Sequence, residues 1–207
     1  MDSYSLARST MVYFMHSYKK IKFSLFKILA LLSALLFSFN LYAAPGSIHI
    51  KNAELIPVDD RYILNSDFDL TLNNVLEDAL TKGVPLTFLV EFQITTPRTY
   101  WFDDEIITQS YRVSLSYHAL SRQFLIIRNK SQFSFNNLQQ AKEALSKIKD
   151  WAVVDKSLLK KGEPYQAALR VRLDQSKLPK PLQVEASGSE NWTLVSERHQ
   201  WTPAFNL

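Results

Sequence analysis

Apolar and polar side chains alternate along three long stretches of this chain, and this alternation restricts the fold more than any other feature of the sequence. In residues 86–94, 111–118 and 165–174, every second residue is apolar and the residues between are mostly polar. A period of two is typical of antiparallel strands with one buried face and one wet face. Residues 62–64 and 68–72 show the same alternation. Weaker strand candidates lie at 48–55, 100–107, 123–128, 151–154, 182–186 and 192–195.

Two short helices are expected to interrupt the strands. Asn74 and Glu77 resemble a capping arrangement, and Gly83 ends the apolar stripe that follows them. Asn137 is expected to open a second helix, which closes near Lys149. The sequence therefore predicts a mainly β fold, a single antiparallel β-sandwich-like domain with two short helical insertions, over residues 44–207.

Residues 1–43 have the organisation of a secretion signal. Lysines precede an uncharged apolar run at 28–39, and small residues follow it. Cleavage is predicted between Ala43 and Ala44, because a later cut would place Pro45 beside the scissile bond. The apolar run is shorter than the roughly 20 residues of a spanning helix. The expected location is the periplasm, with inner-membrane contact only through the leader before cleavage; the alternative is a membrane-anchored protein that faces the periplasm.

The positive charge of the chain is confined to this leader. The whole sequence has 24 basic and 20 acidic residues, and residues 1–43 contain five of the basic ones and one of the acidic ones. The other 164 residues are therefore balanced, with 19 of each sign. A neutral domain lacks the basic surface that nucleic acids attract, so no nucleic-acid partner is expected.

Several chemistries lack their sequence motifs. The chain has no cysteine, which excludes disulfides, thiolate metal sites and cysteine nucleophiles. Its four glycines lie far apart, whereas a phosphate-binding loop needs several close together. No histidine has an acidic residue at the spacing that zinc hydrolases use. The Gly-x-Ser-x-Gly motif of serine hydrolases is also absent. No metal, cofactor or catalytic residue is predicted, although residues dispersed in the sequence can still meet in a folded site.

In the first candidate binding segment, at 98–105, aromatic residues are followed directly by acidic residues. It could form a binding lip with a site for a cation or an amine. The alternative is a strand whose aromatics pack in the core and whose acids cap the next turn. The candidate residues are Arg98, Tyr100, Trp101, Phe102 and Asp103.

The second candidate is the polar face of the strand at 111–118. Arg112 and His118 are expected to point outward, with Arg122 just beyond, where they could bind an anionic or sugar ligand. The alternative is an ordinary wet sheet face. Serines on the same face lie about 7 Å from their neighbours along the strand, too far from His118 for proton transfer. Arg112→Ala and His118→Ala are expected to leave the melting temperature nearly unchanged while weakening ligand capture.

Several ordered segments of the chain resemble one family. They are Gly83-Val84-Pro85-Leu86, Pro97-Arg98, Tyr100-Trp101-Phe102-Asp103, Tyr111-Arg112, residues 115–123, Leu173-Asp174, Leu178-Pro179-Lys180-Pro181 and Asn191-Trp192. These segments resemble DUF4390, a family of bacterial envelope proteins, although Thr99 stands where such proteins often have another aromatic. The resemblance implies an exported domain without an established activity, cofactor or ligand. Family members tend to be encoded near a ribosomal-RNA methyltransferase and a sensor kinase, which suggests envelope signalling.

Three functional hypotheses follow. The first is a non-catalytic periplasmic domain that binds an envelope protein or a small ligand and is linked to envelope signalling. The second is an envelope enzyme that acts on cell-wall or lipid material. The third is an assembly component that docks a partner by strand addition. A concavity joining Arg98, His118 and Arg122 would favour a ligand or a substrate, and a flat open edge would favour docking.

Overall fold

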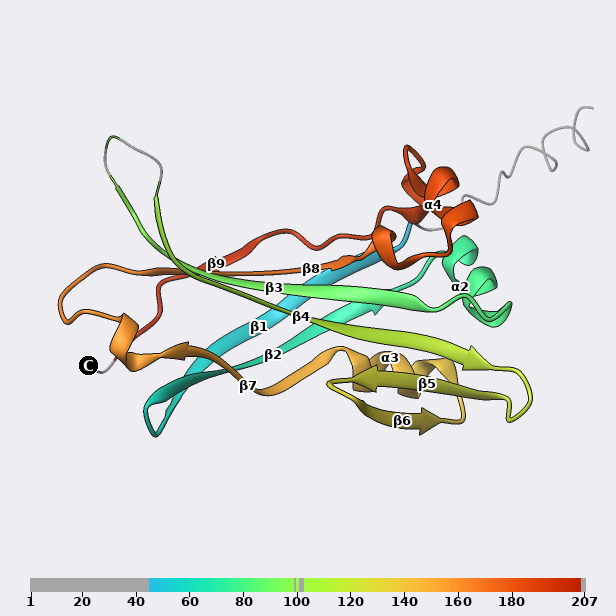
Figure 1. Ribbon diagram of the computed structural model, residues 1–207, viewed down its shortest axis with the longest axis horizontal. Coiled ribbons are helices and arrows are strands. Elements are labelled where there is room, and N and C mark those ends of the chain that lie inside the picture. Colours follow the sequence, from blue (N-terminus) through green and yellow to red (C-terminus); the bar gives the residue numbers. More distant parts are fainter. Residues whose placement is uncertain (1–44, 99, 101–102, 206–207) are drawn as a thin grey trace, which may run out of the picture. The chain divides into compact units, whose positions relative to one another are not determined.

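Figure 1 shows the fold as a computed structural model, which describes residues 45–98, 100 and 103–205. The contacts between residues show that Ala44–Leu207 forms one compact unit. The strands of this unit form two antiparallel sheets, whose apolar faces share one core. The predicted antiparallel, mainly β fold is therefore confirmed.

The smaller sheet has three strands in the order β1-β2-β7. β1 (Ser47–Val58) and β2 (Arg61–Thr71) form a hairpin, and Asp59 in its turn has a φ of 49°. β7 (Lys147–Asp155) pairs with the other side of β2, with two shifts of register. The chain thus forms β3 to β6 of the larger sheet, returns to add β7 to the smaller sheet, and then completes the larger sheet with β8 and β9.

The larger sheet has six strands in the order β6-β5-β4-β3-β8-β9. The strand bounds are Leu86–Thr96 for β3, Asp104–His118 for β4, Gln123–Arg128 for β5, Ser131–Phe135 for β6, Gln166–Leu173 for β8 and His199–Trp201 for β9. β3 lies at the centre, between β4 and β8 (Figure 1). The three stretches with the clearest alternation became these three adjacent strands.

The inner face of β3 explains why this strand is central. Phe88, Val90 and Phe92 are fully buried, and Leu89 and Glu91 between them lie on the opposite face, where Leu89 is also buried. Tyr62 and Leu64 of β2 are also fully buried and belong to the same core. Burying a large aliphatic or aromatic side chain contributes roughly 1.5–3 kcal/mol, so this shared core is what holds the two sheets together.

Both predicted helices are present, with small differences at their ends. α2 (Asn74–Thr81) begins after Asn73, whose side-chain oxygen accepts a hydrogen bond from the backbone N–H of Leu76 at 2.9 Å. The cap is thus Asn73 rather than the predicted Asn74. α3 (Leu138–Leu145) begins after Asn137, as predicted. It ends at Leu145 rather than near Lys149, because the chain passes there into β7.

Arg128 holds the C-terminal end of α3 against the larger sheet. Its side chain lies on the inner face of β5 and donates hydrogen bonds to three backbone carbonyls, those of Ala144 (3.2 Å), Leu145 (3.3 Å) and Lys147 (3.0 Å). The last carbonyls of a helix have no hydrogen-bond partners within it. A cation at this end also interacts favourably with the negative end of the helix dipole. Arg128 therefore fixes α3 over β5 and β6.

The C-terminal third of the chain contains another helix, which the sequence did not predict. The strand expected at 182–186 is wrong, because α4 (Lys180–Ala186) occupies these residues and has proline in its first turn. Short 3₁₀ turns flank the strands here, namely η1 (Lys156–Leu158), η2 (Gln175–Lys177) and η3 (Glu190–Trp192). Residues 192–195 contribute only one isolated bridge, from Val195 to Arg172. The strand expected at 100–107 begins only at Asp104.

Candidate functional site

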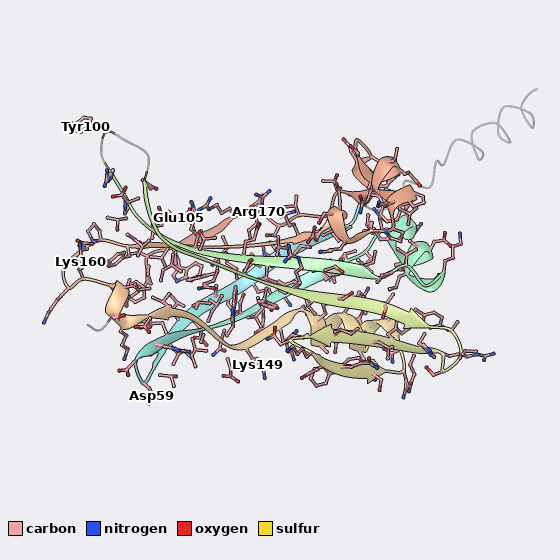
Figure 2. The ribbon with its side chains drawn as sticks, in the orientation of Figure 1. Asp59, Tyr100, Glu105, Lys149, Lys160 and Arg170 are labelled. Atoms are coloured by element: carbon pink, nitrogen blue, oxygen red, sulfur yellow. The ribbon has the colours of Figure 1, made fainter. Side chains whose placement is uncertain are left out.

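Arg98, Tyr100 and Asp103 lie between β3 and β4, and the charged residues there bind one another. The guanidinium of Arg98 donates to the carboxylate of Asp104, and the backbone N–H of Arg98 donates to Asp103 Oδ1 at 3.3 Å. Tyr100 does not pack in the core, because it is 94% exposed at the tip of the hairpin (Figure 2). Trp101 and Phe102 lie outside the described residues, as do Ala43 and Ala44.

Arg112 points outward from the middle of β4, as predicted, but it is not a free surface charge. Its Nε donates a hydrogen bond to Oδ2 of Asp174 at 2.8 Å. Burial alone would raise the pKa of Asp174, but hydrogen bonds from Ser176 and Arg112 outweigh it and lower this pKa below its ordinary value. Arg112 therefore stabilises the start of η2, where Asp174 is the N-cap.

His118 and Arg122 lie at the far end of β4, in the turn to β5. His118 Nδ1 accepts a hydrogen bond from the backbone N–H of Ser121 at 3.3 Å and lies 3.0 Å from Ser121 Oγ. Arg122 adopts a φ of 53° there. The Ser121–His118 contact closes an exposed turn, and the sequence had not predicted it.

The structure does not bring the two candidate segments together. They lie at opposite ends of β4, which has 15 residues and so spans about 45 Å at the usual rise of a strand. Arg98, Tyr100 and Asp103 are at one end, and His118 and Arg122 are at the other, with Arg112 between them. A single small ligand cannot reach both ends.

A different group of polar residues lines a cavity on the outer face of the larger sheet. The cavity has a volume of about 220 Å³ and lies over β3, β4 and β8, next to the start of β9. Figure 2 labels two of its lining residues, Glu105 and Arg170. Its polar side chains come from Glu91, Gln93, Glu105, Thr108, Arg170 and Arg198.

Hydrogen bonds orient most of these side chains. The amide of Gln93 donates to Glu105 Oε2 at 2.8 Å, and its oxygen accepts from the guanidinium of Arg198. Glu91 lies directly opposite Arg170 in the pairing of β3 and β8, yet it binds Arg172 at 3.2 and 3.3 Å. These contacts hold both acids, Glu91 and Glu105, and the amide of Gln93, and they leave Arg170 to solvent.

Arg170 is the side chain that distinguishes this cavity. It is exposed, and among the described residues its guanidinium forms neither an ion pair nor a side-chain hydrogen bond. Arginine has five N–H donors in a planar fork and binds carboxylates through two of them. The arrangement therefore suits an acidic group that enters from solvent.

Sequence reasoning missed this site for a physical reason. Alternation in β3 and β8 already predicts that Glu91 and Arg170 face outward, which is a usable signal. The cavity, however, depends on which strands are neighbours, and Arg198 comes from a segment with no predicted strand. Residues so distant in sequence gave no local pattern.

The described residues show no group of three or more histidine, cysteine, aspartate or glutamate side chains that could hold a metal ion. Within the same part of the chain, no helix is long and apolar enough to cross a membrane.

Comparison with known proteins supports the resemblance seen in the sequence. No curated protein and no solved structure matches the chain. The sequence profile of a domain of unknown function, DUF4390, matches residues 46–202, which includes every described strand and helix. The chain therefore belongs to the DUF4390 family.

Proposed function

We propose that this protein is a non-catalytic binding domain of the cell envelope, which holds a carboxylate group of its ligand or partner in the outer-face cavity. The observation that carries the proposal is Arg170. Its guanidinium is solvent-exposed beside the cavity and has no ion-pair partner among the described residues, whereas Arg172 and Arg112 are both paired.

The neighbours of Arg170 favour a carboxylate over other anions. Glu91 and Glu105 also line the cavity, and their negative charges would oppose a dianion such as a phosphate group. A single carboxylate can bind Arg170 while Gln93 or Thr108 contributes a hydrogen bond from the opposite side. The volume of about 220 Å³ suits a side chain or a small acid better than a large ligand.

The envelope location is part of this proposal, and the leader at residues 1–43 supports it. In the periplasm, the carboxylate could belong to a small molecule or to an acidic residue in an extended segment of a partner protein. Both sources present the same carboxylate to Arg170. The experiment below therefore uses a small acid and a peptide as separate probes to distinguish them. A role in envelope signalling would require the second source.

The test compares Arg170→Ala with Arg61→Ala, which removes an exposed arginine at the start of β2. Each protein is titrated with acetate, with a blocked peptide that contains one glutamate, and with inorganic phosphate, while chemical shifts of arginine Nε–H groups are followed by NMR. We expect the parent and Arg61→Ala to bind a carboxylate probe, and Arg170→Ala to bind it about tenfold more weakly or less. Tighter binding of the peptide than of acetate would identify a partner segment as the source.

Capture from crosslinked envelopes gives the second readout. The parent and Arg61→Ala should capture the same molecules, and Arg170→Ala should lose them while it keeps the same melting temperature. Equal capture by all three proteins would contradict the proposal. Preferential binding of phosphate at Arg170 would contradict the carboxylate assignment.

A further inference from the structure

β6 is an exposed edge of the larger sheet, and it lacks the features by which edge strands usually avoid pairing. Such features are charges, proline, bulges and very short length. β1 has Lys51, Glu54, Pro57 and a bulge after Ile50, and β9 has only three residues. The remaining edge, β7, has two shifts of register and carries lysines and aspartates. β6 (Ser-Gln-Phe-Ser-Phe) has no charge, no proline and no shift of register against β5.

The turn before β6 fixes which of its backbone groups face the free edge. Asn129 and Lys130 both have positive φ, at 46° and 68°, which is the conformation of a two-residue type I′ hairpin. In such a hairpin the flanking residues, Arg128 and Ser131, form a hydrogen-bonded pair. Alternation then directs the N–H and C=O groups of Gln132 and Ser134 away from β5, toward the edge.

We propose that two copies of this protein pair antiparallel along β6, about a two-fold axis at Phe133. This register places Gln132 opposite Ser134 of the other copy, so that all the outward backbone groups of both residues are paired, in four hydrogen bonds. Phe133 then faces its own symmetry mate at a non-hydrogen-bonded position, where side chains approach most closely. The two six-stranded sheets become one continuous sheet.

The side chains of β6 suit this register. Phe133 is 51% exposed and lies on the same face as buried Ile126, beside α3, so pairing would cover a ring that now contacts water. Lys130 comes opposite Asn136 of the other copy, so no like charges meet. α3 packs over β4, β5 and β6. With strands about 4.8 Å apart, its symmetry mate lies roughly 14 Å away, which leaves room for the two phenyl rings.

The contact is small, so we expect a weak dimer that forms with rising concentration. Two five-residue strands and one aromatic pair bury less than the roughly 1,200 Å² of a stable interface. This surface lies at the end of the sheet away from Arg170. Dimerisation therefore stands or falls independently of carboxylate binding.

The first test uses the absence of cysteine in the chain. In Phe133→Cys, the two introduced thiols should face each other at about 4.5 Å between Cα atoms, within the range that a disulfide spans. Under mild oxidation, we expect most of Phe133→Cys to form a covalent dimer, and Gln200→Cys, which is exposed on the opposite edge strand β9, to remain monomeric. Equal crosslinking of both variants, or none of Phe133→Cys, would overturn the proposal.

The second test checks the register by charge. Gln132→Lys with Ser134→Lys places lysine opposite lysine and should weaken dimerisation about tenfold, as measured by sedimentation equilibrium. Gln132→Lys with Ser134→Glu places lysine opposite glutamate and should restore dimerisation. Both proteins should melt like the parent, because these side chains are exposed. Self-pairing is contradicted if the parent stays monomeric at every concentration, or if the lysine–glutamate variant dimerises no more tightly than the lysine–lysine variant. It is also contradicted if Phe133→Cys crosslinks only to another protein.

Discussion

Arg112 and Asp174 form an ion pair across 2.8 Å that joins the middle of β4 to the turn after β8. The two residues are unequally exposed, since the side chain of Arg112 is 51% accessible and that of Asp174 only 6%. Asp174 also accepts hydrogen bonds from the backbone N–H and the hydroxyl of Ser176, at 3.2 and 2.6 Å. The carboxylate thus organises the turn, and Arg112 neutralises it.

We expect Arg112→Ala to destabilise the protein by about 1–2 kcal/mol, because it removes the ion-pair partner that a nearly buried carboxylate has among the described residues. Arg172→Ala is the matched control. It removes an outward arginine from the neighbouring ion pair, but its partner Glu91 is 33% exposed and can be rehydrated, so the loss should be about 0.5 kcal/mol. Urea denaturation of both variants measures the difference. Equal losses would show that the burial of Asp174 does not matter.

Phe88→Ala and Phe92→Ala should each reduce the free energy of unfolding by about 3–5 kcal/mol, because both side chains are fully buried at the centre of the core. That loss is comparable to the whole stability of many domains. Phe133→Ala, at an exposed ring on β6, should cost less than about 1 kcal/mol. Thermal melting of the three variants checks this, and unchanged melting of Phe88→Ala would mean that the opposite face of β3 is buried.

The fold was largely predictable because burial imposes a pattern on each strand separately. β3 and β8 have one face in the core, so their apolar residues recur at every second position. The same reasoning failed at α4, where Leu182, Val184 and Ala186 also alternate. There Leu182 and Ala186 share a helix face and Val184 is exposed, and Pro181 lies in the first turn, where proline suits a helix. A short apolar alternation does not distinguish these two cases.

The candidate site was less predictable, because it depends on which strands are adjacent in the sheet and not on the alternation within one strand. Alternation correctly placed Arg112 outward, and from that position the sequence predicted a nearly neutral Arg112→Ala. The buried partner Asp174 comes from another strand end, 62 residues later, and no local pattern reveals it. The same applies to Arg170. The alternation along β8 predicts that its side chain points outward, but the cavity beside it depends on the strand order β4-β3-β8.

Export is the prediction that concerns the leader. We expect the protein recovered from the periplasmic fraction to begin at Ala44, because a small residue at position 43 follows the apolar run at 28–39. Mass spectrometry of the native protein measures its first residue. Ala43→Leu is the matched variant and should retain the leader, since the peptidase requires a small side chain there. An intact leader on the parent protein in the membrane fraction would contradict cleavage.

Tyr111 gives the domain a distinct sensitivity to alkaline pH. Its ring packs edge-on against Trp151 of β7, with 4.6 Å between the ring centroids, and so bridges the two sheets. Burial raises the pKa of Tyr111 to about 12, and the positive charge of Arg128 opposes this only in part. The neutral phenol is therefore the form that the folded protein prefers.

Because the pKa of Tyr111 is raised in the folded protein, its contribution to stability is complete below the ordinary tyrosine pKa of about 10 and is lost as the pH rises toward 12. We expect the parent to lose roughly 2 kcal/mol more than Tyr111→Phe between pH 9 and pH 12, since the variant has no phenol to ionise at this position. Tyr100→Phe, at an exposed ring, should follow the parent. Urea denaturation at each pH measures the three curves, and absorbance at alkaline pH reports tyrosinate formation. Parallel curves for the parent and Tyr111→Phe would show that the Tyr111 hydroxyl is hydrated in the folded protein.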